Sequence, residues 1–328
     1  APPPAERPPE RSSPPSAKAE RVCDRMVAPW GSDSASGKPR EPFRGVGKLV
    51  KSLRPGWTGC LRGGTYTKSE VIVRQRKVTL RSAPGERATW RGRIILEGRR
   101  DKLVDLVLDG SYGRKGLPNP TVNAPGVVVS DSDITNTRGI CVNVRTWRGE
   151  RPDGFVIQRN RIHDCGRRPP TNHDHGIYVV DGVGGLIRDN VIFRNADRGV
   201  QLYPSAHDTT VVRNTIDGNG SGVIISNASS RNLFRENLIS YSVERWNAES
   251  HNLTGRGNRF EANCLRAAHP RDPGYDENGG VVLPPIVHQA DNVVIDQEPY
   301  RARASGDYTP AAHGCPAKGA RGPARKPR

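Results

Sequence analysis

The stretch Thr171-Asn172-His173-Asp174-His175 brings two imidazoles and a carboxylate together within five residues. A histidine exchanges its proton near neutral pH, and a carboxylate beside it can orient the ring or share the proton. This composition indicates general acid–base chemistry. The His-x-His spacing is also compatible with zinc or manganese binding, and a structural or ligand-contacting role for the same residues stays open.

A glycine followed by alternating apolar residues recurs along the middle of the chain, at Gly139, Gly176, Gly199 and Gly222. The last two intervals are both 23 residues long, which indicates a repeating structural unit. The residues before these glycines, together with the one found by counting eight residues on from Asn237, form one column: Arg138, His175, Arg198, Ser221 and Arg245. Since stacked units lie about 4.8 Å apart, we expect this column to be a mostly cationic row that holds an anion.

Further columns place polar and aromatic side chains on the same central units. The residues one position before the cationic row include Asp174 and Asp197. The column two residues after the glycines contains Cys141, Tyr178, Gln201 and Ile224, and the column two residues further on contains Asn143, Val180, Tyr203 and Ser226. Each of these residues taken alone could simply end a strand on a solvated face. Taken together, they predict a site in which Arg138, Asn172, Gln201, Tyr203 and Arg245 bind the substrate.

A loop is inserted beside this cluster. The segment from Asn160 to Gly176 is 16 residues long, whereas the equivalent segment from Asn190 to Gly199 is nine, so residues 166–173 contain the insertion. A loop placed next to polar and titratable residues is typical of the wall of a binding site. Cys165 stands at its base and is expected to anchor it.

The strands that must position these residues are short and alternate with asparagine turns at Asn160, Asn190, Asn214 and Asn237. Strands of three to five residues without two-residue hairpin turns cannot close as separate hairpins. They can stack as the coils of a solenoid, in which each asparagine hydrogen-bonds to the asparagines above and below. We expect these side chains to point inward: Ile177, Val179, Val200, Leu202, Val223 and Ile225.

This pattern resembles the right-handed parallel β-helix proteins of the pectate-lyase-like superfamily, over about residues 65–265. The resemblance implies an all-β fold, a right-handed parallel β-helix with disulfide-tied terminal caps. The superfamily includes lyases, hydrolases, epimerases, esterases and phage adhesins, so the fold leaves the reaction open. We expect a disordered tail at 1–20, an N-terminal cap at 21–64 with a helix over 43–53, the β-helix at 65–265, and a C-terminal loop or cap with a basic tail at 266–328.

The site is similar to that of alginate lyases and C5-epimerases on this fold, whose Asp-Pro-His motif precedes a strand, with an aspartate about one coil later. Here Asp174-His175 and Asp197 occupy comparable places. The proline is missing, so either His175 or His173 could correspond to the family histidine. In a β-elimination at a uronic acid, His175 would be the base, Arg198 would neutralise the substrate carboxylate, and Tyr178 or Tyr203 would be the acid.

Three other functions stay open. Asp174 and Asp197, about 5 Å apart on adjacent coils, could be the two carboxylates of a glycoside hydrolase. A C5-epimerase would use the same residues as the lyase. A non-catalytic polysaccharide-binding solenoid would need only the cationic row. No cofactor is expected to be required, and calcium held by carboxylates, as in many related lyases, is an open alternative.

The composition favours a secreted protein with an acidic partner. The 328 residues carry 51 Lys and Arg against 34 Asp and Glu, a net charge of +17, which attracts an acidic polysaccharide. Aromatic residues make up 5% and acidic residues are interleaved with basic ones, which argues against nucleic-acid binding. No run of 18 apolar residues exists, and the mean hydropathy is −0.67, so no membrane span is predicted. We expect a monomer.

The six cysteines show no Cys-x-x-Cys spacing and are even in number, which is typical of disulfides formed in an oxidising compartment. Six cysteines permit 15 connectivities. We expect the pairs that are local in sequence, Cys23–Cys60, Cys141–Cys165 and Cys264–Cys315. The chain begins with alanine and three prolines, without the basic and apolar regions of a signal peptide. We therefore expect that a leader has been removed or precedes this sequence.

Overall fold

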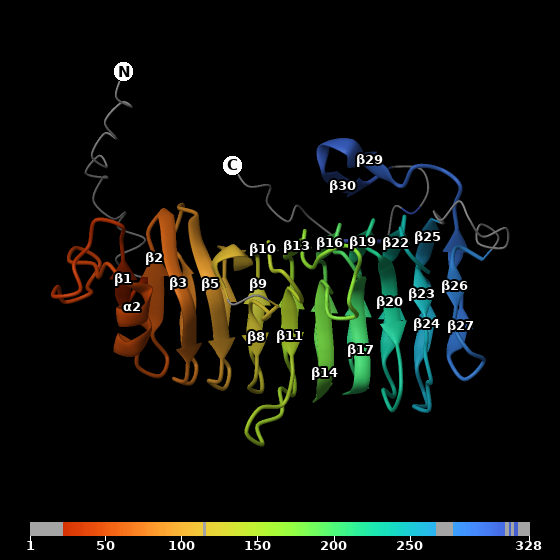
Figure 1. The fold of residues 1–328 in the computed structure, drawn as a ribbon, viewed down its shortest axis with the longest axis horizontal. Helices are drawn as coiled ribbons and strands as arrows, with labels where there is room; N and C mark the ends of the chain where they lie inside the picture. The colour runs from red at the N-terminus through yellow and green to blue at the C-terminus, as the bar shows by residue number, and fades with distance from the viewer. Residues whose placement is uncertain (1–21, 114–115, 267–277, 312–314, 316–317, 321–328) are drawn as a thin grey trace.

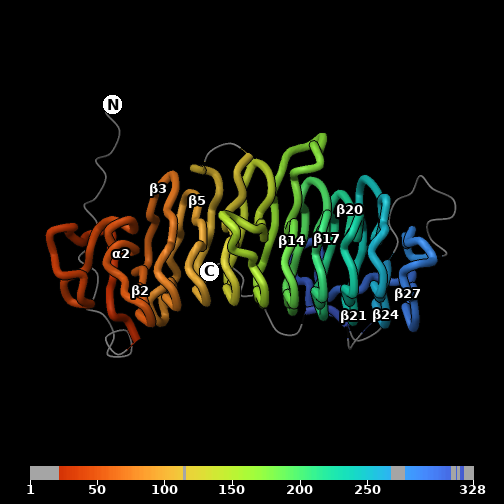
Figure 2. Tube along the Cα trace, turned by 90° about the horizontal axis from the view of Figure 1, so that it is seen from below, coloured from red at the N-terminus to blue at the C-terminus, as the bar shows by residue number. Residues whose placement is uncertain are grey.

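The computed structural model describes residues 22–113, 116–266, 278–311, 315 and 318–320. Short parallel strands stack side by side along the long axis of an elongated solenoid (Figure 1), and each turn of the chain lies beside the next (Figure 2). The predicted parallel β-helix is confirmed, and the expected tail at 1–20 lies outside the described residues.

The strands form three faces. Face 1 contains β1 (Arg25–Val27), β2 (Thr58–Leu61), β4 (Thr79–Ser82), β6 (Lys102–Val104), β9 (Val128–Ser130), β12 (Val156–Gln158), β15 (Leu186–Arg188), β18 (Thr210–Val212), β21 (Leu233–Arg235), β24 (Arg259–Glu261) and β27 (His288–Ala290). Face 2 contains β7 (Leu106–Asp109), β10 (Asp133–Thr135), β13 (Arg161–His163), β16 (Val191–Phe193), β19 (Thr215–Asp217), β22 (Leu238–Ser240), β25 (Cys264–Arg266) and β28 (Val293–Val294).

Face 3 carries the residues of the predicted site. It contains β8 (Thr121–Val122), β11 (Val142–Val144), β14 (Ile177–Val183), β17 (Arg198–His207), β20 (Ser221–Ile225), β23 (Ala248–Glu249) and β26 (Val281–Val282). Two longer strands, β3 (Gly64–Val73) and β5 (Ala88–Leu96), run from face 2 into face 3 at the N-terminal end.

Inward side chains of successive coils stack in rows. Ile177 pairs with Val200, and Val200 with Val223, so the predicted 23-residue register is confirmed. All six residues predicted to point inward are at most 1% exposed. Each row is buried only because a neighbouring coil covers it, which makes the coils depend on one another for stability.

An asparagine ladder runs along the corner between faces 1 and 2, as predicted. The Asn190 side chain donates to Asn214 at 2.9 Å, and Asn214 donates to Asn237 at 3.0 Å. The residue before each of these asparagines has a positive φ, for example 51° at Arg213, which turns the chain sharply. The buried amides hydrogen-bond the backbone groups that this corner leaves without partners in a sheet.

The N-terminal end of the solenoid is capped. The helix predicted over 43–53 is α2 (Val46–Ser52), and its Val46, Leu49 and Val50 are buried. Leu53 lies under the first coils, within 3.2 Å of the position a side chain would occupy at Gly59. The short helix η1 (Gly110–Tyr112) lies after β7. No helix in the described ranges is long and apolar enough to cross a membrane.

The C-terminal part differs from the expected loop. The coils continue beyond residue 265, because β26, β27 and β28 pair with the preceding strands. A hairpin of β29 (Tyr300–Ala302) and β30 (Asp307–Pro310), joined by η2 (Arg303–Ser305), then folds back over face 2 (Figure 1). Arg303 donates to the buried Asp217 at 2.9 Å. These last strands are two or three residues long, too short for their alternation to be read from sequence.

Candidate active site

The polar residues predicted on adjacent coils meet where the chain enters face 3. The Gly176 N–H donates to the carbonyl of Arg198 at 2.9 Å, and the Asp197 N–H donates to the carbonyl of Asp174 at 2.9 Å. His175 therefore lies beside Arg198, one coil away, as the repeat predicts. The backbone at this corner places one histidine, one carboxylate and one guanidinium within reach of each other.

His175 is fully buried at the centre of this group. Its Nδ1 lies 3.4 Å from Oδ2 of Asp197, and neither ring nitrogen has a hydrogen-bond partner. The Tyr178 ring packs edge-on against it, with 5.4 Å between ring centroids. Burial, and next the charge of Arg198, lowers the pKa of His175 to about 3. The imidazole is therefore neutral at physiological pH.

A buried charge network surrounds the imidazole. Arg198 contacts Oδ2 of Asp197 at 2.7 Å and Oε1 of Glu249 at 3.6 Å. Arg245 contacts the same two residues, reaching Oε1 of Glu249 at 3.3 Å and hydrogen-bonding to Asp197. Burial raises the pKa of Asp197, although Arg198 and Arg245 act to lower it. We define these four residues with His175 as the His175 cluster.

These ion pairs correct the prediction of a mostly cationic row. Two guanidiniums of the row, Arg198 and Arg245, are paired with the carboxylates of Asp197 and Glu249, which lie outside the row, so their charges are balanced. The repeat pattern does not predict Glu249, because the chain between β20 and β23 departs from the 23-residue period. Val223 pairs with Ala248, 25 residues on, and this offset hides the column that contains Glu249.

The alignment on Gly139 was also wrong. Val142 pairs with Ile177, so Ile140 rather than Arg138 stands opposite His175. Arg138 is exposed, and a side chain at Gly139 would come within 3.2 Å of the carbonyl of His173. Two residues separate Gly139 from β11, whereas Gly176 directly precedes β14. Aligning the two glycines therefore misplaces Arg138 by two positions. Arg245 is likewise shifted by one position and stands opposite Gly220, although its side chain still reaches the cluster.

The corrected register defines an outward row on face 3. Asn143 pairs with Tyr178, Tyr178 with Gln201, and Gln201 with Ile224. Asn143 and Gln201 are each 6% exposed, and their side-chain carbonyl oxygens accept no hydrogen bond. Leaving a buried polar group without a partner costs about 1–3 kcal/mol. Together with the ring nitrogens of His175, these oxygens leave unused hydrogen-bonding capacity in the corner around His175 and along this row.

The inserted loop 166–173 closes over the His175 cluster. The Asp174 carboxylate accepts hydrogen bonds from the backbone of Arg167 at 3.1 Å and from the backbone and hydroxyl of Thr171 at 2.7 and 2.6 Å. Asn172 accepts a hydrogen bond from Arg198 at 3.0 Å. Asp174 is therefore committed to shaping the loop. This counts against Asp174 and Asp197 as the acid and base of a hydrolase.

The loop also bridges several coils. Arg168 contacts Glu244 at 2.8 Å, and both side chains are more than 40% exposed. Glu244 belongs to the coil of β22 and β23, three coils beyond that of the loop. The exposed pair thus fastens the loop across the coils that carry Asp197 and Arg245, which explains why His175 is buried.

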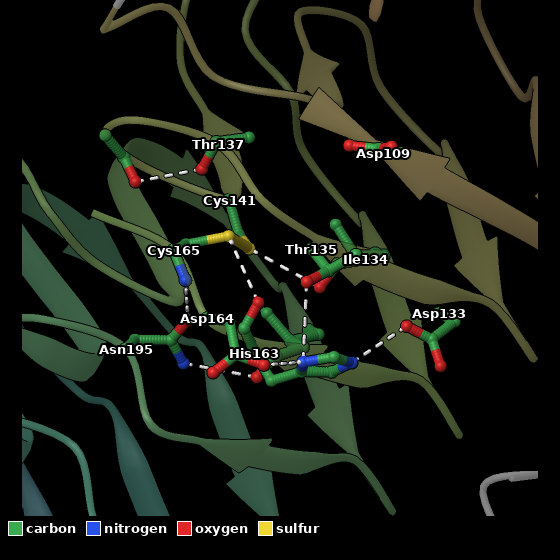
Figure 3. The surroundings of a disulfide bond; sticks show 12 residues. Asp109, Asp133, Ile134, Thr135, Thr137, Cys141, His163, Asp164, Cys165 and Asn195 are labelled. Carbon is green, nitrogen blue, oxygen red and sulfur yellow. Dashed lines mark hydrogen bonds and ion pairs between the residues drawn. A yellow bond between two sulfur atoms is a disulfide. The ribbon is translucent and has the colours of Figure 1, made fainter. Parts of the chain in front are cut away.

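The base of the loop is fixed by a disulfide (Figure 3). Cys141 is bonded to Cys165, and the Asn195 side chain accepts the N–H of Cys165 at 3.1 Å. Cys23–Cys60 and Cys264–Cys315 are also formed, so the three predicted pairs are confirmed. Figure 3 also shows His163 between Asp133 and Asp164, with its Nε2 2.9 Å from Asp133. This histidine lies on β13 of face 2, apart from the His175 cluster, and was not predicted from the sequence.

The other predicted site residues lie at the edge of the cluster. His173 and Asn172 are exposed on the loop, and Tyr203 is 36% exposed on β17. The structure therefore distinguishes the two candidate histidines, since only His175 contacts Asp197 and Tyr178.

The donor set does not fit a metal. Calcium prefers six to eight oxygen ligands. In the described part of the chain, no three His, Cys, Asp or Glu side chains converge in a way that would hold a metal ion. The carboxylates of Asp197 and Glu249 contact guanidiniums instead.

Comparison with known proteins supports the fold. Residues 153–239 match the family model described as "Right handed beta helix region". The solved structure of pectate lyase Pel9A superposes with a TM-score of 0.60 and 14% identity, covering 84% of this chain and 79% of that one. An alginate lyase from Paenibacillus sp. str. FPU-7 has a TM-score of 0.50 and 14% identity, covering 76% and 96%.

Sequence relatives match over about half of this chain. Mannuronan C5-epimerase AlgE3 from Azotobacter vinelandii is 28% identical over 191 residues, which are 56% of this chain and 9% of the epimerase. Pectate lyase PEL9 from Emericella nidulans is 25% identical over 210 residues, which are 56% of this chain and 50% of the lyase. The chain thus spans half or less of the length of these relatives.

Proposed function

We propose that this protein, a pectate-lyase-like right-handed β-helix protein, is a carbohydrate-active enzyme that cleaves an acidic polysaccharide by β-elimination at a uronic acid. The observation that carries the proposal is the His175 cluster: a neutral imidazole without hydrogen-bond partners, beside a guanidinium and a tyrosine. The names of the relatives support it, because mannuronan and pectate are both polymers of uronic acids.

His175, Arg198 and Tyr178 each have one role in this reaction. His175 removes the proton on the carbon next to the sugar carboxylate, and the electron pair forms a carbon–carbon double bond as the glycosidic C–O bond breaks. Arg198 stabilises the negative charge that develops on the carboxylate. Tyr178 gives its proton to the leaving oxygen; burial raises its pKa, so the hydroxyl is protonated and available as the acid.

Asp197 supports the base. Its carboxylate lies 3.4 Å from Nδ1 of His175 and stabilises the positive charge that forms on the ring when it accepts the proton. The pKa of about 3 belongs to the buried ring under the closed loop. A substrate carboxylate placed beside the ring favours its charged form and raises that pKa toward the usual value for histidine.

A polymer can reach His175 only if loop 166–173 moves. An exposed ion pair such as Arg168–Glu244 is worth about 0.2–1 kcal/mol. We expect Arg168→Ala to raise kcat/KM up to about fivefold at low salt, with the difference vanishing at high salt as the pair is screened. Steady-state kinetics at two ionic strengths measures this. Arg167→Ala, an exposed neighbour, is the control, and unchanged kinetics of the Arg168 variant at low salt would argue against gating.

The test of the reaction is incubation with polygalacturonate and alginate in the presence of EDTA. β-Elimination predicts a rise in the ultraviolet absorbance of unsaturated uronates, and it should not depend on added metal. Absence of any absorbance change on either polymer contradicts the lyase assignment.

The second candidate is a uronate C5-epimerase, because four of the matched relatives are mannuronan C5-epimerases. Epimerisation begins with the same proton removal but returns a proton to the opposite face. In D₂O it would introduce deuterium into the polymer without any change in absorbance. Nuclear magnetic resonance of the recovered polymer therefore separates the two reactions.

The site of action is proposed to be extracellular. Three disulfides are formed within the described residues, as expected for a protein that matures in an oxidising compartment. A polymeric substrate too large to enter a cell is consistent with this location.

A further inference from the structure

A rigid hairpin projects from face 3 directly after β11. Trp147 and Glu150 exchange two backbone hydrogen bonds of 3.0 Å, and the residues between them, Arg148 and Gly149, both have positive φ. Such a tight turn holds its side chains in fixed positions. The hairpin presents an indole ring that is 42% exposed.

The hairpin is braced on both sides. The N–H of Thr146 donates to the Asp181 carboxylate on β14 at 2.6 Å. Arg99 contacts both carboxylate oxygens of Glu150, at 2.9 and 3.1 Å. Its conformation therefore does not depend on a ligand, and the ordering cost of binding to it is small.

Two guanidiniums flank the exposed indole. Arg145 lies 5.8 Å and Arg148 5.9 Å from the Trp147 ring centre, and both side chains are exposed. Neither has a carboxylate partner among the described residues. Several other surface arginines, in contrast, pair with an acid on a neighbouring coil, as Arg159 does with Asp131 and Arg194 does with Asp164.

A hollow of about 530 Å³ lies beside the hairpin, and its charged side chains, unlike Arg145 and Arg148, are paired. Its lining includes Arg99, Glu150, Arg151 and Asp153. These four charges pair with each other, Arg99 with Glu150 and Arg151 with Asp153. The unpaired guanidiniums are therefore confined to the side of the hairpin that carries Trp147.

This side of the hairpin continues the row of the candidate active site. Arg145 is the next outward position after Asn143, and Asn143 pairs with Tyr178 one coil on. Burial raises the pKa of Tyr178, and the charge of Arg145 acts in the opposite direction. His175, Tyr178, Arg145 and Trp147 thus follow one another across face 3.

We infer that Arg145, Trp147 and Arg148 form a subsite for a further acidic sugar unit of the polymer, farther along face 3 than the one at His175. The guanidiniums bind the sugar carboxylate by charge-assisted hydrogen bonds, and the indole packs against the apolar face of the ring. The assignment of a uronic acid rests on the proposed function. The subsite would set the minimum length of the bound oligosaccharide and its preference for charge on both units.

The test measures binding without turnover, in a His175→Ala background, by calorimetry with polygalacturonate and alginate oligosaccharides. We expect Arg145→Ala/Arg148→Ala to weaken the Kd about 10-fold and to reduce its salt dependence. Arg145→Lys/Arg148→Lys should restore part of the affinity, because the charge returns without the planar fork. Arg159→Ala removes a paired arginine elsewhere and should change the Kd less than twofold.

Each possible result of the binding experiment either supports or overturns the subsite. A loss no larger than that of Arg159→Ala overturns the subsite even if the parent protein proves to be a lyase. A 10-fold loss in a protein that never yields unsaturated products supports the subsite and removes only the proposed reaction. Failure of both oligosaccharides to bind, or equal binding of a neutral dextran oligosaccharide, overturns the subsite as well.

Discussion

Replacing His175 by alanine is expected to lower kcat about 10²- to 10⁴-fold, the contribution typical of a general base, while the affinity for the polymer changes little. The imidazole is neutral and has no hydrogen-bond partner, so its removal takes away a group needed only when the proton is transferred. Initial rates on the accepted polymer measure kcat, and calorimetry measures Kd.

His173→Ala is the matched control for this prediction. His173 lies on the same loop two residues away but is exposed and does not contact Asp197. We expect less than about a threefold change in kcat. His175→Gln, which keeps a polar group of similar length, should fold normally and remain inactive. A His175→Ala protein that is folded by circular dichroism and retains full turnover would remove the catalytic assignment and favour a non-catalytic binding solenoid.

The buried His175 also makes stability depend on pH. In the unfolded chain a histidine binds its proton near pH 6.5, whereas in the folded chain His175 binds one only near pH 3. Between these values the unfolded state holds more protons, so the free energy of unfolding decreases as pH falls from about 6.5 toward 3. This component should be absent from the unfolding curves of His175→Gln.

Replacing Asn214 by leucine is expected to reduce the free energy of unfolding by about 3–5 kcal/mol, a large fraction of the stability of a typical domain. Its side chain donates to the Ile187 carbonyl at 2.9 Å and to Asn237 at 3.0 Å, and it accepts the N–H of Asn190 at 3.0 Å. Leucine has nearly the same shape but leaves these buried groups without partners.

Asn292→Leu is the control within the same ladder. Asn292 accepts from Asn263 at the C-terminal end of the described ladder and is only partly buried. We expect a loss of about 1–2 kcal/mol, since water can reach the freed groups. Urea unfolding followed by two spectroscopic probes measures both variants and shows whether the solenoid unfolds in one step. Equal losses for the two variants would contradict the argument from burial.

The fold and the centre of the site could both be predicted from the amino-acid sequence. A constant period of 23 residues also gives the pairing register of the strands, because each residue lies beside the residue 23 positions further along the chain. The inward rows, the asparagine ladder and the meeting of His175 with Asp197 and Arg198 followed from counting alone. The disulfide pairs followed as well, since each links cysteines local in sequence.

The tertiary structure decided everything that depends on coils of other lengths. The 35-residue step from Val142 to Ile177 moved Arg138 away from His175, and the 25-residue step from Val223 to Ala248 concealed Glu249. Turns outside the ladder can lengthen without disturbing the buried rows, so no periodic signal constrains them. For the same reason, only the folded chain reveals that loop 166–173 reaches Glu244 and buries His175, because an exposed ion pair between distant coils leaves no pattern in the sequence.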